Sequence, residues 1–267
     1  MQLKYNEKQI LILGKGWHYA KTSTILIALG AAFAASTILF GINEEASGLS
    51  SAVGRWTFNN GNPAIASDNS GAGNDGTING ATVLSSQDCE KSHCLNFDGL
   101  DDFVSVPNSP TLNFGSTESF SISLWMKSSQ SGGDKLIVDK RRNNDGIYQG
   151  YSIEDNSGLL IGIVRDSAAN DVPVFSTTNV NDGNFHHIVY VIDRSTQTAK
   201  LYVDNFPQAT ASISSVGSID SSVNLLLGGQ QVPNTPVDFY SGTLDQVTIY
   251  NQALSPSEIR TLFVSGS

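Results

Sequence analysis

From Val53 to Tyr250 the sequence repeats one pattern, in which short stretches of alternating apolar and polar residues are separated by clusters of Gly, Asn, Asp and Ser. Alternation with a period of two residues is typical of half-buried strands, and evenly spaced turn residues are typical of antiparallel sheets. No long helical period occurs before the last dozen residues. The pattern therefore predicts an all-β domain, an antiparallel two-sheet β-sandwich or jelly roll.

The expected strands end before a short C-terminal helix. Ser255 is a suitable N-cap, Pro256 suits the first helical position, and Glu258 completes a capping box. The strands are expected at residues 54–58, 76–78, 81–84, 94–97, 103–106, 120–127, 135–140, 150–154, 159–164, 173–176, 186–193, 198–203, 223–227 and 242–250.

The charge balance of the chain is acidic, with 15 Lys and Arg against 25 Asp and Glu in 267 residues. Four of the bases precede the first hydrophobic run, so residues 51–267 carry 11 basic and 22 acidic side chains. Binding to nucleic acid requires a basic surface. The sequence therefore argues against a nucleic-acid partner and favours a cation or a neutral polar ligand.

Residues 22–42 contain no charged side chain, and as a helix they would span roughly 30 Å, enough to cross a bilayer. Lysines precede this run and two glutamates follow it, which places the N-terminus inside. We therefore expect a cytoplasmic tail at 1–21, a single transmembrane signal-anchor at 22–42, a linker at 43–52 and the domain at 53–267.

Two alternatives to the anchor stay open. The run Ala32-Phe33-Ala34 suits a signal peptidase, in which case the domain would be secreted, and a buried helix of a soluble protein is the third possibility. The anchor and the cleaved signal both place the domain outside the cell membrane, in an extracellular or periplasmic location.

Four segments carry motifs in a characteristic order, among them Phe-Asp-Gly-Leu-Asp-Asp-Phe-Val, Phe-His-His-Ile-Val-Tyr-Val and Leu-Asp-Gln-Val-Thr-Ile-Tyr-Asn. The segments are residues 68–77, 94–107, 185–204 and 242–258. Together they resemble the laminin-G-like, or concanavalin A-like lectin/glucanase, jelly-roll family. The sequence departs from the family pattern at Phe185 (usually Trp), Asn205 (usually Gly) and Gln246 (often acidic). The resemblance implies the same sandwich but does not define a ligand.

Asp68, Asn74 and Asp75 offer side-chain oxygens within one glycine-rich loop. Calcium prefers carboxylate, amide and backbone carbonyl oxygens, so this loop is a candidate structural calcium site. The family resemblance implies that Asp245 approaches the loop. The alternative is a loop whose Asx turns bond only to its own backbone. A second acidic group, at residues 98–102, is better explained by turn chemistry.

Cys89 and Cys94 are the two cysteines of the chain. A disulfide that closes a hairpin is expected on the oxidising side of the membrane. A metal site that includes His93 would lack a fourth ligand. His186 and His187 are adjacent, so on a strand they point to opposite faces; we expect one in the core and the other in solvent.

Catalysis is not expected. The glucanases of the resembling family place paired glutamates on one strand face, and the glutamates beyond the linker (Glu90, Glu118, Glu154 and Glu258) show no such spacing. A Gly-x-Ser-x-Gly nucleophile motif is also missing from the sequence.

A polar loop at residues 140–146 is flanked by Tyr148 and Tyr151 and contains Arg141 and Asn143. Tyrosine rings can stack on a sugar, and guanidinium and amide groups can bond its hydroxyls. The alternative is a solvated hairpin tip with one tyrosine packed.

These features favour a non-catalytic, membrane-tethered module that binds carbohydrate or a surface protein, stiffened by calcium and a disulfide. A structural cell-surface or envelope component that packs against copies of itself is the alternative, and a glycoside hydrolase is the least favoured.

Overall fold

The computed structural model describes residues 51–144, 146–232 and 235–266. The fold below is that of these residues, all of which belong to the unit Ala46–Ser267. The predicted membrane segment at residues 22–42 lies outside the described residues. Within the described ranges, no helix combines the length and the apolar content needed to cross a bilayer.

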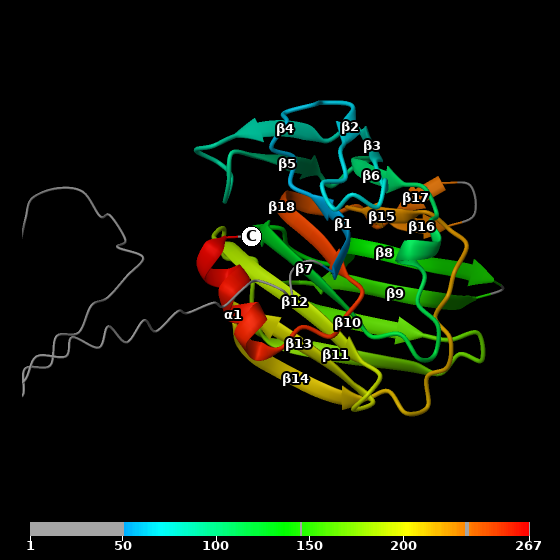
Figure 1. Cartoon of the computed structure of the whole chain (residues 1–267). Helices are drawn as coiled ribbons and strands as arrows, with labels where there is room; N and C mark the ends of the chain where they lie inside the picture. The colour runs from blue at the N-terminus through cyan, green and yellow to red at the C-terminus, as the bar shows by residue number, and fades with distance from the viewer. Residues whose placement is uncertain (1–50, 145, 233–234, 267) are drawn as a thin grey trace, which may run out of the picture. The chain divides into compact units, whose positions relative to one another are not determined.

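The described residues form two antiparallel sheets of eight strands each and a small two-stranded ribbon (Figure 1). Sheet A has the order β14-β13-β12-β7-β18-β5-β4, with β1 also paired to β18, and sheet B has the order β11-β10-β9-β8-β15-β6-β3-β2. Sheet A contains β1 (Ala52–Trp56), β4 (Thr82–Ser85), β5 (His93–Asp98), β7 (Phe120–Lys127), β12 (Phe185–Asp193), β13 (Thr198–Val203), β14 (Phe206–Ser212) and β18 (Ser241–Tyr250).

Sheet B contains β2 (Ile65–Ala66), β3 (Gly76–Asn79), β6 (Phe103–Val106), β8 (Asp134–Asn144), β9 (Ile147–Asn156), β10 (Leu159–Arg165), β11 (Asp171–Asn179) and β15 (Leu225–Leu227). The ribbon is β16 (Gln230–Val232) with β17 (Thr235–Val237), and the helices are the 3-10 turn η2 (Pro110–Leu112) and α1 (Pro256–Ser265). Every strand expected from the sequence is present, which confirms the all-β sandwich. Strands β2, β14, β16 and β17 were not expected.

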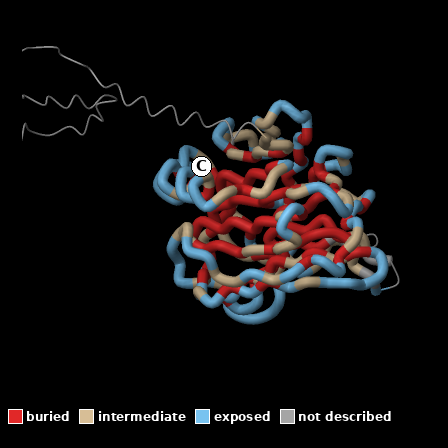
Figure 2. Tube along the Cα trace, turned by 60° about the horizontal axis from the view of Figure 1, so that its bottom comes forward, coloured by how far each residue is buried: buried red, intermediate tan, exposed pale blue. Residues whose placement is uncertain are grey.

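The core lies between the two sheets, and strands such as β6 and β10 bury alternate residues in it, whereas β7, β12 and β18 are buried along nearly their whole length (Figure 2). One continuous apolar cluster joins side chains of both sheets, including Leu124, Ile188 and Leu244 from sheet A with Val138, Ile153 and Leu160 from sheet B. The period-two pattern of the sequence therefore reflects a real difference between an inner and an outer face.

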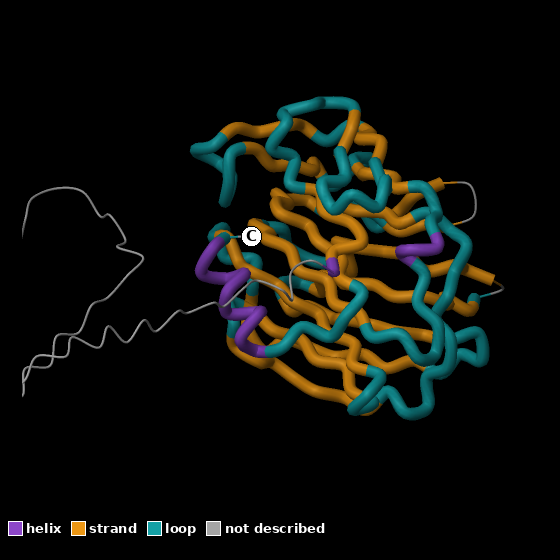
Figure 3. Tube along the Cα trace, in the orientation of Figure 1, coloured by secondary structure: helices purple, strands orange, loops and turns teal. Residues whose placement is uncertain are grey.

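Helix α1 covers part of the outer face of sheet A (Figure 3). Its predicted capping box is confirmed, because the Ser255 hydroxyl accepts from the Glu258 N–H while the Glu258 carboxylate accepts from the Ser255 N–H. The helix buries Ile259 and Leu262 against the outward-facing side chains of β12, β13 and β18. This contact explains why outward positions of those strands are apolar.

Strand β14 follows a tight turn at Asp204 and Asn205, both of which have positive φ, 51° and 65°. A two-residue hairpin turn with positive φ at both positions matches the right-handed twist of the strands that it joins, and Asn tolerates the left-handed region well. The strand sequence, Phe-Pro-Gln-Ala-Thr-Ala-Ser, carries a weak apolar pattern because β14 is an edge strand. Pairing with β13 therefore determines this strand more than its own sequence does.

The side chain of Lys140, on β8, is buried inside a cage of oxygens. Its Nζ lies 2.8 Å from Asn108 Oδ1, 2.7 Å from Asn113 Oδ1, 2.7 Å from the Ser221 carbonyl and 2.9 Å from the Val223 carbonyl. Burial lowers the pKa of Lys140 to about 8, so the group carries its charge at neutral pH. One ammonium group thus ties the η2 loop and the segment before β15 to β8.

We predict that Lys140→Met lowers the free energy of unfolding by about 2–4 kcal/mol, because it leaves several buried oxygens without a donor. Urea unfolding at pH 7 measures the change. Lys135→Met is the matched control, since Lys135 is half-buried on the same strand, and we expect it to change stability by no more than about 0.5 kcal/mol. Equal losses in the two variants would contradict the role assigned to the cage.

Candidate functional site

One end of sheet A gathers loops from five distant parts of the sequence. Because neighbouring strands are antiparallel, the ends of β5, β7 and β13 lie beside the starts of β12, β14 and β18. The connecting loops, residues 98–102, 128–133, 180–184, 204–205 and 238–240, therefore lie at this end of the sheet. We refer to these five loops and the adjoining strand ends as the rim.

A hollow of about 270 Å³ opens at the rim between the C-terminal ends of β5 and β7 and the N-terminal end of β18. Its lining is mostly polar and includes Asn96, Asp98, Lys127, Ser129, Gly183 and Thr243. Amide, hydroxyl, carboxylate and ammonium groups converge there from separate strands. Such a set can donate and accept hydrogen bonds around a small polar ligand.

An aromatic ring lies next to the hollow. Phe185 pairs with Lys127 across β12 and β7, and the Lys127 Nζ lies 5.3 Å from the centroid of the Phe185 ring. The ring thereby holds the only ammonium group of the lining in place. Both side chains are partly exposed, so a ligand could contact the ring and the ammonium together.

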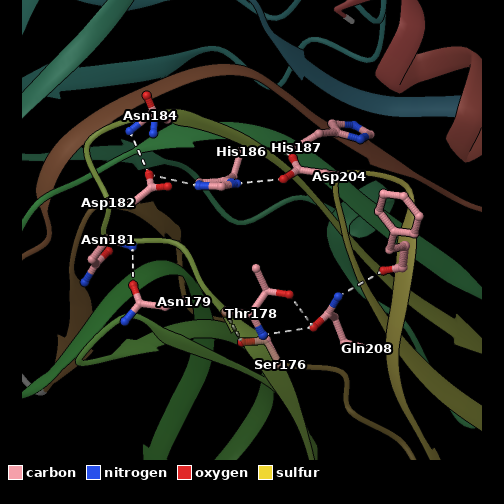
Figure 4. A network of polar contacts seen from close by, with 11 residues as sticks. Ser176, Thr178, Asn179, Asn181, Asp182, Asn184, His186, His187, Asp204 and Gln208 are labelled. Carbon is pink, nitrogen blue, oxygen red and sulfur yellow. Dashed lines mark hydrogen bonds and ion pairs between the residues drawn. The ribbon is translucent and has the colours of Figure 1, made fainter.

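The 180–184 loop is bound to the rest of the rim by His186 (Figure 4). The imidazole Nδ1 lies 2.7 Å from Asp204 Oδ2, and Nε2 lies 3.1 Å from Asp182 Oδ1. Its hydrogen bond to Asp204 raises the pKa of His186. Hydrogen bonds from Asn184 and from His186 lower the pKa of Asp182 to about 2.

Further hydrogen bonds fix the same loop. The Gly183 N–H donates to the Ser128 carbonyl at 2.9 Å, and the Asn181 amide donates to Asp155 Oδ2 at 2.8 Å. Nearby, the Gln208 carbonyl oxygen accepts from the backbone N–H of Thr178 (Figure 4) and from that of Thr177. This last contact joins β14 of sheet A to β11 of sheet B beside the rim.

The predicted pair of histidines differs from expectation, because neither side chain is in solvent. His186 is 9% exposed and bonded to two carboxylates. His187 is fully buried on the opposite side of β12, with Nε2 2.9 Å from the Ser123 hydroxyl, and burial lowers its pKa to about 4. The sequence indicated opposite faces but not the two aspartates that enclose His186.

Three of the four predicted calcium ligands lie together in one hydrogen-bonded loop. Asp68 Oδ1 accepts from the N–H groups of Arg55 and Ser70, and Oδ2 accepts from the Ser70 hydroxyl and the Asn74 N–H. Asp75 Oδ1 accepts from the Asp68 N–H at 2.7 Å. Although burial acts to raise it, these hydrogen bonds lower the pKa of Asp68.

Asp245, the fourth predicted ligand, is fully buried and bonded elsewhere. Its Oδ2 accepts from the Lys91 N–H at 2.8 Å, and its Oδ1 accepts from the N–H of Gln246 at 2.7 Å. Burial, together with the charge of Glu90, raises the pKa of Asp245 to about 6. The hydrogen bonds of Asp245 thus join β18 to the hairpin that contains Glu90 and Lys91.

That hairpin is closed by the predicted disulfide between Cys89 and Cys94, with the two Cα atoms 5.5 Å apart. The disulfide prediction is confirmed. Because both sulfurs are in the disulfide, neither is a thiolate ligand for the alternative metal site with His93.

The predicted sugar-binding cluster at residues 141–151 is divided by the fold. Arg141 is buried, with Nε 2.5 Å from Asp139 and Nη1 2.5 Å from Glu154. Tyr148 remains partly exposed, with its ring centroid 5.6 Å from the Arg141 guanidinium. This region therefore contains a buried ion-pair network rather than a solvated arginine.

Tyr151 packs in the core, as the alternative of one packed tyrosine predicts, and it is not available to a ligand. It is 1% exposed, its ring lies 5.1 Å from that of Phe120, and its hydroxyl donates to the Leu112 carbonyl. The alternation of β9 accounts for this, because Tyr151 and Ile153 share the inward face. The side chain of Asn143 lies outside the described residues.

A family model described as the concanavalin A-like lectin/glucanases superfamily matches residues 98–260. Among curated proteins, the botulinum-like toxin eBoNT/J of Enterococcus sp. (strain 3G1_DIV0629) is 24% identical over 176 residues, which is 61% of this chain and 13% of the toxin.

Among solved structures, the binding domain of Paraclostridial Mosquitocidal Protein 1 matches with a TM-score of 0.65 at 18% identity, over 80% of this chain and 52% of that one. The binding domain of botulinum neurotoxin serotype G matches with a TM-score of 0.63 at 16% identity, over 80% and 51%. The serotype D ligand binding domain in complex with N-acetylneuraminic acid matches with a TM-score of 0.61 at 14% identity, over 81% and 51%. This chain thus spans about half of those domains, and the likeness shows the fold.

We predict that Asp68→Ala, measured with a chelator present, lowers the free energy of unfolding by about 2 kcal/mol at pH 7, because four hydrogen bonds lose their acceptor. Since the folded pKa lies below the ordinary 3.8, the carboxylate stabilises the fold above that pH. The difference from the unchanged chain should therefore shrink as the pH falls through the folded pKa.

Asp75→Ala is the matched control, since its carboxylate accepts a hydrogen bond from the Asp68 N–H, and we expect it to cost about 1 kcal/mol. A loss at Asp75 as large as at Asp68 would contradict the role of Asp68 as the centre of the loop.

Proposed function

We propose that this chain, which belongs to the concanavalin A-like lectin/glucanases superfamily, is a non-catalytic module. The module binds carbohydrate at the rim. The observation that carries the proposal is the hollow beside the Lys127–Phe185 pair. A sugar presents hydroxyls that need hydrogen-bond partners and a C–H face that packs on an aromatic ring. The rim offers both kinds of contact in one place.

The charge of the rim favours a neutral sugar over an acidic one. Asp98 lines the hollow together with Lys127, Asp182 and Asp204 lie on other loops of the rim, and the domain as a whole is acidic. An anionic ligand would be repelled by this field. The serotype D domain was solved with N-acetylneuraminic acid; it supports carbohydrate as a ligand class here, whereas the acidic rim argues against that sugar.

The carboxylates of the described domain fit a structural role better than catalysis of glycoside hydrolysis. A retaining glycosidase needs one protonated and one ionised carboxyl group facing the same bond. Asp139 and Glu154 both bind the buried guanidinium of Arg141, in a structural ion-pair network. In the cluster of Asp98, Asp101 and Asp102, the buried Asp102 braces the turn by accepting from the Asp98 N–H.

The site of action is part of the same proposal. The uncharged run at residues 22–42 would hold the module on the outer side of a membrane, and the sequence supports this with the lysines before the run and the glutamates after it. A disulfide in the folded domain agrees with an oxidising compartment.

We predict that a glycan array probed with the full chain retains neutral sugars, and that Lys127→Ala and Phe185→Ala each weaken the affinity for the retained sugar by about tenfold or more. Ile65→Ala is the control, because Ile65 is an exposed apolar residue of β2 in sheet B. Isothermal titration calorimetry measures the affinities.

Binding that survives both rim substitutions would contradict the placement of the site. An array that retains no sugar, together with ordered self-association of the chain, would instead support the structural surface component.

Calcium at the 68–75 loop is a separate proposal. The carboxylates of Asp68 and Asp75 are chemically suitable, but both oxygens of Asp68 already accept hydrogen bonds, so an ion would have to replace some of them. If calcium binds, the unfolding midpoint should rise and saturate as calcium is added, and Asp75→Ala should abolish the rise. A midpoint that is the same in calcium and in chelator would contradict calcium binding.

A further inference from the structure

His186 is enclosed by carboxylates from two separate loops. It begins the inward-facing row of β12, directly opposite Met126 of β7, at the rim. Asp204, from the turn between β13 and β14, lies on its Nδ1 side, and Asp182, from the 180–184 loop, lies on its Nε2 side (Figure 4). One imidazole thus connects two loops that are not neighbours in the sequence.

The number of loops that the ring can hold depends on its protonation. An imidazolium donates from both nitrogens, whereas a neutral imidazole donates from one and presents a lone pair at the other. A lone pair facing a carboxylate is repelled. The observed geometry, with a carboxylate oxygen within hydrogen-bond distance of each nitrogen, therefore suits the charged ring and not the neutral one.

We propose that His186 is a proton-operated clamp, which ties the 180–184 loop to the 204–205 turn when the ring is charged and releases Asp182 when the ring is neutral. Asp182 is the arm that is released because its contact is longer, 3.1 Å against 2.7 Å, and its side chain is 48% exposed. Asp204 stays in place, since its other oxygen accepts from the His187 N–H at 2.9 Å.

In the described domain, Asp182 and Asp204 are the electrostatic partners of the His186 ring, because the other charged or titratable groups near it are bonded to other residues. Lys127 of β7 lies over the Phe185 ring, and His187 is bonded to Ser123 on the other face of β12. Asp155 of β9 accepts from Asn181 and Gln130. The pKa of His186 is raised above its ordinary 6.5, mainly by Asp204 and then by Asp182.

The raised pKa of His186 determines whether the clamp is favoured at low or at high pH. A histidine whose folded pKa is raised stabilises the clamped state fully below pH 6.5, and this stabilisation is lost as the pH rises through the folded pKa. Acidification therefore closes the clamp, and a rise in pH through the folded pKa of His186 opens it.

The clamp acts on the hollow through the loop that it holds. Gly183 lines the hollow and follows Asp182 directly, and its N–H donates to the Ser128 carbonyl beside Lys127. Release of Asp182 loosens one wall of the hollow. An effect of pH on sugar affinity rests on the proposed function, whereas the clamp itself can be tested without a ligand.

The test is an NMR titration of the full chain from pH 5 to pH 9 that follows the His186 imidazole and the backbone amides of Gly183 and Asn184. His186→Gln identifies the ring signal. Asp182→Asn removes the charge of the releasable arm at an exposed position. Asp88→Asn is the matched control, since it makes the same charge change at an exposed residue on the hairpin at the far end of β5.

We expect His186 to titrate above pH 6.5, the two loop amides to titrate with the same midpoint, and Asp182→Asn to lower the His186 pKa by about half a unit or more while Asp88→Asn leaves it unchanged. A His186 pKa at or below 6.5, or an equal shift in the two variants, would overturn the proposal. Loop amides that do not follow the His186 titration would also overturn it, because His186 would then be a fixed structural contact. None of these results depends on whether the rim binds sugar.

Discussion

Strand β18 is the element on which sheet A depends. It pairs along β7 on one side, while on the other side it pairs first with β5 and then with β1, and its register shifts at Asp245 where the partner changes. Both of these partners come from the start of the domain, whereas β18 is its last strand. The early strands therefore find their place only when the end of the chain is present, which makes the contacts of this sheet strongly non-local.

The same arrangement creates the rim. Antiparallel pairing brings the C-terminal ends of β5 and β7 beside the N-terminal end of β18, so the side chains around the hollow come from segments far apart in the sequence. Three polar groups fix loops of the domain, and only the last of them is at the rim: the Lys140 ammonium beside η2, the Asp68 carboxylate in the 68–75 loop and the His186 ring. Each satisfies backbone or side-chain partners that the sheets leave unpaired. Loops that are fixed before binding lose less conformational entropy when a ligand arrives.

The sequence predicted the sandwich well because alternation records which face of a strand is buried. It predicted the Cys89–Cys94 disulfide and the capping box at Ser255 because each depends on residues a few positions apart. It missed β14 because that edge strand buries little and is determined by its partner β13. For the segment that contains Tyr148 and Tyr151 it left two interpretations open, and the place of Tyr151 on β9 decides for a packed tyrosine.

Most of the candidate site could not be predicted from the sequence. Lys127 and Phe185 are separated in the sequence by strands β8 to β11 of sheet B, and the pairing of β7 with β12 brings them together. The enclosure of His186 by Asp182 and Asp204 likewise requires the loop before β12 and the turn after β13 to meet. In the calcium set, by contrast, Asp68, Asn74 and Asp75 are close in sequence and are together in the structure, while Asp245 bonds to the disulfide hairpin.

The central claim is that the rim of sheet A is the binding surface. The most direct measurement is a map of backbone amide shifts caused by the sugar that the chain retains on an array. If the sugar binds at the rim, the largest shifts should fall at residues 96–98, 127–129, 183–185 and 241–243. Shifts concentrated on the outer strands of sheet B, at β10 and β11, with the rim unchanged, would contradict it.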